Sequence, residues 1–297
     1  YIAPRMQEIY LFDATVQGNG RATTGITPQK LKGTSARLIW QTGTAVRAVV
    51  CDVGYNGRRI SFRTGTAIGG NALIGLFDKD GDCIWSWHIW ATNGALTTHV
   101  YPSGYVFMDR NLGAENLDPG DPASRGLYYQ WGRKDPFPYP ASFTNNARPA
   151  SFIYHDGHAY GTIRPEDYDA REVMSVEWAT QHPTTFIHKA DYEVDEPEED
   201  VLDWLFRSHH NLWGNTTEQG YDVSKVCRKT IYDPCPPGWR VPDACDFEGI
   251  AMSQTQLPYC VNIVYSGTKT VRYPAGGTFD GDSYSGAGTY GQVYTNT

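Results

Sequence analysis

Histidines with a neighbouring carboxylate are the first candidates for chemistry in this chain. His155 and His158 flank Asp156, and two histidines at this spacing beside an acid could bind a transition metal. Histidine pairs in loops are more often merely exposed to solvent. We therefore expect no metal ion and no cofactor at this position.

Three aspartates, Asp78, Asp80 and Asp82, have the alternation seen in calcium-binding loops. An EF-hand loop also needs a glutamate at its twelfth position and flanking helices, whereas this run lies between two strand-like segments. We expect a hairpin turn here, and we expect ligand binding to be independent of calcium.

Six cysteines are present, namely Cys51, Cys83, Cys227, Cys235, Cys245 and Cys260. Their pairing cannot be deduced from the sequence. Cys51 and Cys83 each share a strand face with apolar residues, so both are expected to point into one core, either bridged or as buried thiols. No CxxC motif occurs, which argues against a zinc ribbon.

Signatures of common enzyme classes are missing from the sequence. It has no GxSxG, HExxH or GxxxxGK[ST] motif, and no GxGxxG between a strand and a helix. The late cysteines Cys245 and Cys260 lack nearby basic residues that would stabilise a thiolate. We therefore expect a protein that is not an enzyme.

Composition favours a secreted protein with many strands and ordered loops. Aromatic residues make up 13% of the chain, which also has 31 glycines and 18 prolines. The net charge of −8 and the lack of a basic cluster argue against a nucleic-acid partner. Charged residues or glycine interrupt every apolar run before it reaches membrane-spanning length.

The first hundred residues have the pattern of an all-β unit. Segments rich in β-branched and aromatic residues, each bounded by Gly, Asn or Asp, lie at 36–40, 45–51, 59–62, 72–77 and 83–90. Short strands at regular spacing, without helical patterns between them, predict a β-sandwich.

The second part of the chain is irregular, with long polar loops. Partial helix is expected over 166–178, and an acidic start with an apolar stripe predicts a helix over 197–213. Residues 229–242, KTIYDPCPPGWRVP, are called the clasp below. They predict a short strand over 229–232 and then a stiff turn, because two consecutive prolines forbid a regular ladder.

The clasp resembles the CPxGWxxP signature of the Fibrobacter succinogenes major paralogous domain, a bacterial surface module with a C-type-lectin-like fold. Further segments resemble the version found in Bacteroidales fimbrillin-like surface proteins. In chain order they are WSWHIW (85–90), GYVFMDRNLGA (104–114), GLYYQWGRKDPFP (126–138), HPTTFI (182–187) and LWGN (212–215). The resemblance covers roughly residues 70–242.

This resemblance implies a mainly β protein with an α+β head. An N-terminal fimbrillin-like β-sandwich would span 1–98, and a C-type-lectin-like domain with long loops would span 99–297. Such a protein would be a non-enzymatic cell-surface adhesin, at or near a fimbrial tip, that binds a host or bacterial protein or glycan. Its other partners would be pilus or surface subunits that assemble by strand donation, and it would lie on the outer membrane or fimbrium.

Alternatives to this interpretation remain. The chain could be a binding module of a free-standing surface lipoprotein, or an oxidase that resembles formylglycine-generating enzymes. The EPN, QPD and WND motifs of animal C-type lectins are missing. Residues 291–295 match the WSS-like strand after which relatives continue into two closing strands. We therefore expect that the lectin-like domain is truncated at this end or closes differently.

Two sets of side chains are predicted to carry structure and binding. Large aromatic rings in strands or in the clasp are more often core than binding surface, so the structural set is Trp85, Trp87, Trp131, Cys235, Pro236, Pro237, Gly238 and Trp239. Tyrosines among Gly and Ser in the tail have few apolar neighbours and could contact a ligand. The predicted ligand-binding set is Tyr284, Tyr290 and Tyr294, with His155 and His158 as second choices.

Overall fold

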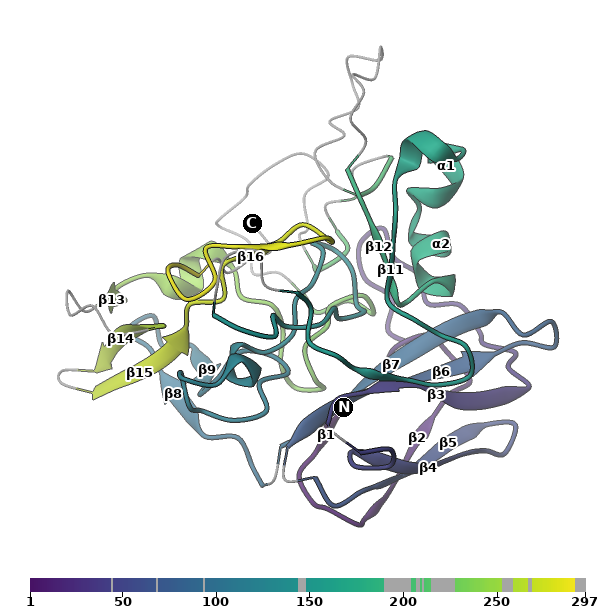
Figure 1. Cartoon of the computed structure of the whole chain (residues 1–297), viewed down its shortest axis with the longest axis horizontal. Coiled ribbons are helices and arrows are strands. Elements are labelled where there is room, and N and C mark those ends of the chain that lie inside the picture. The colour runs from purple at the N-terminus through teal and green to yellow at the C-terminus, as the bar shows by residue number, and fades with distance from the viewer. Residues whose placement is uncertain are drawn as a thin grey trace.

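Strands dominate the fold, and the helices are short (Figure 1). The computed structural model describes residues 1–43, 45–67, 69–92, 94–143, 148–189, 204–206, 209, 211–214, 228–252, 259–266 and 269–291. The protein is therefore mainly β, as predicted. Among the described residues, no helix combines the length and the apolarity needed to cross a bilayer.

The central sheet has five strands in the order β1 (Ile2–Ala3), β7 (Cys83–Ala91), β6 (Gly70–Phe77), β3 (Ser35–Gln41) and β10 (Ile153–Tyr154). β1 runs parallel to β7, and the other pairs are antiparallel. All eight residues of β6 are buried. An apolar strand of this kind needs cover on both faces of its sheet.

A second sheet, in the order β2 (Ile9–Asp13), β5 (Arg59–Thr64) and β4 (Val50–Tyr55), covers one face of the central sheet. β5 alternates buried Ile60 and Phe62 with exposed Arg59 and Arg63, the pattern of a half-buried strand. Figure 1 shows these three strands lying below β3, β6 and β7.

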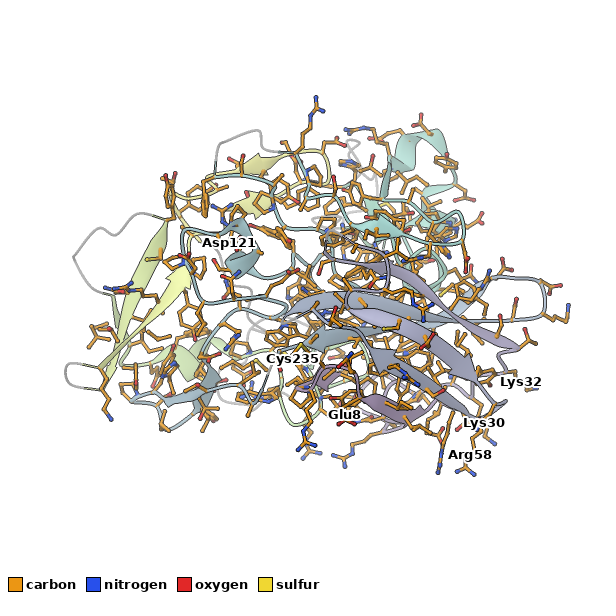
Figure 2. All side chains as sticks on the ribbon, turned by 60° about the horizontal axis from the view of Figure 1, so that its bottom comes forward. Glu8, Lys30, Lys32, Arg58, Asp121 and Cys235 are labelled. Carbon is orange, nitrogen blue, oxygen red and sulfur yellow. The ribbon has the colours of Figure 1, made fainter. Side chains whose placement is uncertain are left out.

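Ring contacts join the two sheets, which together are called the sandwich below. Phe12 lies 5.0 Å from Trp87 and 6.3 Å from Phe62 between ring centroids. Charged side chains of the sandwich point outward, as Lys30, Lys32 and Arg58 do in Figure 2. The strands predicted at 36–40, 59–62, 72–77 and 83–90 are confirmed. The strand predicted at 45–51 is mostly wrong, because residues 45–49 form turns and bends and β4 begins only at Val50.

Residues 99–291, called the loop-rich part below, cover the other face of the central sheet. Leu73 of β6 packs in one cluster with Leu127 and Phe152. The Trp90 indole N–H donates to the Ala114 carbonyl over 3.1 Å, and the Asn71 amide donates to the Gly113 carbonyl over 2.8 Å. These contacts attach the loop-rich part to β6 and β7.

The predicted boundary at residue 98 does not separate two independent cores. Ile153 pairs with Gln41 and Tyr154 pairs with Trp40, so β10 extends the central sheet from beyond the boundary. The largest apolar cluster also joins Trp85 and Trp87 to Ile187 and Leu212. The two parts share a core because β6 and β7 bury side chains on both faces, which a local sequence pattern does not show.

The loop-rich part contains small sheets and short helices. Its further strands are β8 (Thr98–Val100), β9 (Val106–Met108), β11 (Gly161–Ile163), β12 (Thr185–Ile187), β13 (Ala251–Met252), β14 (Cys260–Ser266), β15 (Lys269–Pro274), β16 (Thr278–Phe279) and β17 (Tyr284–Ser285). Its helices are η1 (Pro122–Arg125), η2 (Pro165–Asp167), α1 (Ala170–Val173), α2 (Val176–Gln181) and η3 (Ala244–Phe247).

The predicted helices have different outcomes. The partial helix over 166–178 is confirmed by η2, α1 and α2, and the Ser175 side chain caps α2 by accepting from the Trp178 N–H. Most of the predicted helix over 197–213 lies outside the described residues. Its described residues, 204–206, 209 and 211–213, form bends and a turn and are not helical, so this part of the prediction is wrong.

Leu73→Ala should destabilise both parts of the protein in one transition. Leu73 is fully buried between the central sheet and the loop-rich part, so its loss leaves a cavity that costs about 2–5 kcal/mol. Denaturant unfolding followed by tryptophan fluorescence and by circular dichroism measures this cost. Leu117→Ala is the control, because Leu117 is 54% exposed. Two separate transitions, with only one shifted, would contradict a shared core.

Candidate ligand-binding cavity

A cavity of about 1650 Å³ lies where the sandwich meets the loop-rich part. Its walls come from β7, β9, β14, β15 and the clasp. Aromatic rings and hydrogen-bonding groups alternate along these walls, for example Trp85, Tyr105, Lys229, Trp239 and Tyr273. A concave site with apolar walls and a few polar groups is the usual form of a ligand pocket.

The clasp is held by one buried carboxylate, Asp233. Its Oδ1 accepts from the Lys229 ammonium and from the Cys235 N–H, each over 2.8 Å. Its Oδ2 accepts from the Val241 N–H over 2.9 Å. The carboxylate therefore joins the two ends of the turn, a role that sequence reasoning missed although Asp233 directly precedes the prolines.

Within the clasp, the predicted strand over 229–232 is absent, and the turn is present. Pro236 is buried, whereas Pro237 and Gly238 are exposed at the tip. Gly238 has a φ of 87°, a conformation that glycine adopts readily. The Trp239 N–H closes the turn by donating to the Pro236 carbonyl over 3.0 Å.

Trp239 is half-buried, which corrects the prediction that it is mostly buried. Its indole lines the cavity and is not part of an apolar cluster among the described residues. The turn at Pro237 and Gly238 directs the chain so that the Trp239 ring faces the cavity and not the apolar core. Trp239 is therefore a candidate ligand contact.

The other predicted structural tryptophans differ in burial. Trp85 and Trp87 are 1% and 6% exposed, so their predicted burial is confirmed. Trp131 is half-buried and lies 5.8 Å from the ring of Trp213, which lines the cavity, but Trp131 itself is not a wall residue. The burial predicted for Trp131 is therefore only partly reached.

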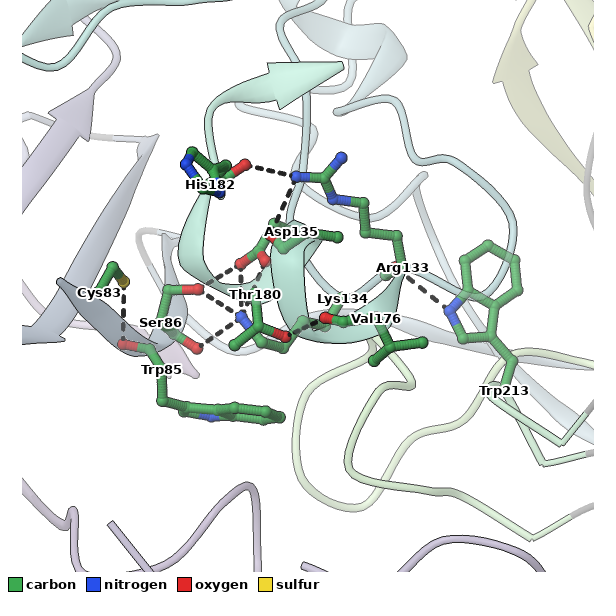
Figure 3. Close-up of polar contacts among 11 residues, drawn as sticks. Cys83, Trp85, Ser86, Arg133, Lys134, Asp135, Val176, Thr180, His182 and Trp213 are labelled. Atoms are coloured by element: carbon green, nitrogen blue, oxygen red, sulfur yellow. Dashed lines mark hydrogen bonds and ion pairs between the residues drawn. The ribbon is translucent and has the colours of Figure 1, made fainter. Parts of the chain in front are cut away.

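Ser86, Lys134 and Asp135 form a buried polar cluster (Figure 3). Ser86 and Lys134 belong to the cavity wall. The Ser86 hydroxyl is hydrogen-bonded to both charged side chains. A serine beside a lysine could be a nucleophile with its base. Here the Lys134 ammonium donates to both oxygens of Asp135 over 2.8 Å, so the lysine is already paired with a carboxylate.

The neighbouring Arg133 also has a structural role. It is 2% exposed and donates to the Thr185 and His182 carbonyls over 2.7 Å. Figure 3 shows the Trp213 indole contacting the backbone of this segment. Burial lowers the pKa of Arg133 to about 10, so the guanidinium remains charged at neutral pH. Residues 133–135 thus link the loops to β7.

The cysteine side chains are poorly suited to nucleophilic chemistry. Among the described residues Cys51, Cys83, Cys235, Cys245 and Cys260 are free thiols, so the Cys51–Cys83 bridge is not formed. Cys83 is buried, whereas Cys51 is half-exposed with its Sγ 3.5 Å from the Arg47 carbonyl, which corrects the expectation of one shared core. Cys227 lies outside the described residues.

Burial raises the pKa of the Cys83 thiol to about 12 and raises the pKa of Cys235 as well. The pKa values of Cys245 and Cys260 are also raised, chiefly by burial. A raised thiol pKa lowers the fraction of the reactive thiolate. These thiols give no support to an oxidase with a reactive cysteine pair.

Asp243, Cys245 and Asp246 are the one group with metal-ligand geometry among the described residues. Arg240 occupies their carboxylates, since its Nη2 lies 3.0 Å from Asp243 and 2.8 Å from Asp246. The guanidinium takes the place that a cation would fill.

The aspartates predicted to form a hairpin turn do so. Asp78 accepts from the Asp80, Gly81 and Asp82 N–H groups in the β6–β7 turn, which confirms the predicted hairpin.

Tyr284 is 1% exposed, which corrects its prediction as a ligand contact. Its ring stacks on Phe279 at 4.4 Å, and its hydroxyl donates to the Pro138 carbonyl over 2.5 Å. The glycine-rich tail folds back closely enough to form this small core. A Cβ at Gly277 would lie only 2.1 Å from the Ser285 carbonyl oxygen.

The remaining predicted ligand residues do not converge. Tyr290 is 42% exposed, and hydrogen bonds with Ser285 and Thr278 lower its pKa. His155 contacts Gln41 at 3.2 Å, and the His158 ring lies 5.8 Å from Phe77. None of these side chains lines the cavity. Tyr294 lies outside the described residues.

No protein-family model, curated protein or solved structure matches this chain.

Cys83 should resist alkylation until the protein unfolds. With a pKa of about 12, only about one part in ten thousand is thiolate at pH 8. Iodoacetamide labelling at pH 8, followed by peptide mass spectrometry, should modify half-exposed Cys51 first and Cys83 only in denaturant. Equal labelling rates of Cys51 and Cys83 in the folded protein would contradict the buried-thiol assignment.

Proposed function

We propose that this chain is a non-enzymatic cell-surface adhesin that holds a glycan or protein ligand in the cavity beside the clasp. The observation that carries the proposal is the composition of the cavity walls. They bring together aromatic rings from distant segments, such as Tyr105, Tyr273 and Trp239. Lys134 is paired with Asp135, and the pKa values of the Cys83 and Cys235 thiols are raised, which suits binding better than catalysis.

The sequence resemblance supports a more detailed assignment within this proposal. The sandwich corresponds to a fimbrillin-like domain, and the loop-rich part corresponds to a C-type-lectin-like domain of the major paralogous type. The protein is then extracellular, on the outer membrane or on a fimbrium. Unlike separate domains joined by a linker, the two units share the central sheet.

An open strand edge supports assembly with pilus or surface subunits by strand donation. β2 is the outer strand of its sheet, and described strands pair with it only on the β5 side. Its side chains Ile9 and Leu11 are 56% and 58% exposed. An exposed apolar edge is a template for an added strand. A free-standing lipoprotein, the second candidate, would not need this edge.

Trp239→Ala should weaken ligand binding about tenfold or more while the protein stays folded. The half-buried indole forms cavity wall, and aromatic side chains in such positions often dominate binding energy. Glycan and host-protein arrays with the full chain identify a ligand, and calorimetry measures the affinity. Tyr168→Ala is the control, because Tyr168 is 60% exposed and is not part of the cavity walls. Unchanged affinity in folded Trp239→Ala would remove the cavity from the proposal.

Leu11→Lys should prevent strand donation onto β2. A charged side chain on an edge strand disfavours pairing with a further strand. Mixing the protein with pilus subunits and separating complexes by size measures assembly. Val46→Lys, at a residue 64% exposed outside the strands, should assemble normally. Equal assembly of both variants would favour the free-standing lipoprotein.

A further inference from the structure

The cations on the cavity walls differ in one respect, namely whether an acid accompanies them. Four of them have a carboxylate within 2.8 Å. These pairs are Arg110–Asp109, Lys134–Asp135, Lys229–Asp233 and Arg240–Asp246. Two more, Arg21 and Arg228, are exposed to water. Pairing and hydration are the two usual ways to stabilise a charge in a protein.

Arg125 is neither paired with an acid among the described residues nor exposed to water. It lines the cavity, it is 3% exposed, and it forms no ion pair with the described residues. Its Nη1 donates to the Ser142 carbonyl over 3.2 Å, and its guanidinium carbon lies 4.0 Å above the Phe143 ring. Its Nε and Nη2 are buried, and neither has a hydrogen-bond acceptor among the described residues. Burial lowers its pKa, which expresses the cost of this unpaired charge.

The two nitrogens without acceptors form one recognition edge. Nε–H and one N–H of Nη2 point in nearly parallel directions on the same side of a guanidinium, so together they match the two oxygens of a carboxylate. The remaining nitrogen, Nη1, is occupied by Ser142. Arg125 therefore has the geometry of a bidentate carboxylate site that none of the described residues fills.

The backbone around Arg125 is held in place. It ends helix η1, which Asp121 caps by accepting from the Ala123 N–H. The Asn111 amide donates to the Arg125 carbonyl over 3.0 Å. Gly126 follows with a φ of 77°, and a Cβ there would lie 2.5 Å from the Leu112 carbonyl oxygen. A fixed side chain loses little entropy when it binds.

From these contacts, and resting on the proposed binding function, we propose that Arg125 anchors the carboxylate of an acidic saccharide in the cavity. The aromatic walls supply faces for sugar rings, with Tyr128 and Tyr273 among them. The volume of about 1650 Å³ exceeds that of typical small-molecule pockets and suits a short oligosaccharide.

The first test uses the unaltered protein. Saccharides that end in glucuronic acid or sialic acid are compared by calorimetry with the methyl esters of the same compounds, which lack the negative charge. We expect at least tenfold tighter binding of the acids. Equal affinity for acid and ester would overturn the role of Arg125 and leave the binding function intact.

The second test combines each ligand with a substitution. Arg125→Gln should lower the affinity for the acid to the level of the ester and leave ester binding unchanged. Arg228→Gln is the matched control, because it removes an exposed cation from the same walls. An equal loss of acid binding in both variants would indicate general electrostatic attraction and would overturn the specific site.

The remaining outcomes separate the two proposals. Selective binding of acidic peptides, with no affinity for acidic saccharides, would overturn the ligand class proposed here. If neither glycans nor proteins bind on any array, the proposed binding function itself fails. If Arg125→Gln does not fold, the comparison of acid with ester in the unaltered protein still tests whether the carboxylate is recognised.

Discussion

The burial of β6 on both faces is the constraint on which the rest of the structure depends. The strand carries no charged residue, and all eight of its positions are buried. The sheet of β2, β5 and β4 covers the face of Ile74, and the loop-rich part covers the face of Leu73. The loops therefore belong to the structural core, and the cavity that they enclose has a rigid wall in β7.

Buried charges explain how loops with so little regular structure are held. Asp233 joins the ends of the clasp, and Lys134 with Asp135 joins a loop to Ser86 of β7. Removing one partner of such a pair is costly because the other charge is left buried. The same pairing engages Lys134, which could otherwise act as a base for Ser86.

Assembly and ligand binding would use different parts of the molecule. The open edge of β2 lies on the outer sheet, and no residue of β2 lines the cavity. A strand added at this edge would therefore not contact β2 residues that line the cavity, because there are none among the described residues. This separation is what an adhesin needs if it is to be fixed in a larger assembly while it holds a ligand.

Local patterns in the sequence determined the strands of the sandwich, the β6–β7 turn and the turn of the clasp. These features depend on alternation and on the φ preferences of proline and glycine, which act within a few residues. Tertiary structure alone decided that Tyr284 is buried and that β10 joins the central sheet. It also decided which cations have acids beside them, leaving Arg125 without one. Such outcomes depend on contacts between residues far apart in the chain, for which a single sequence carries no local signal.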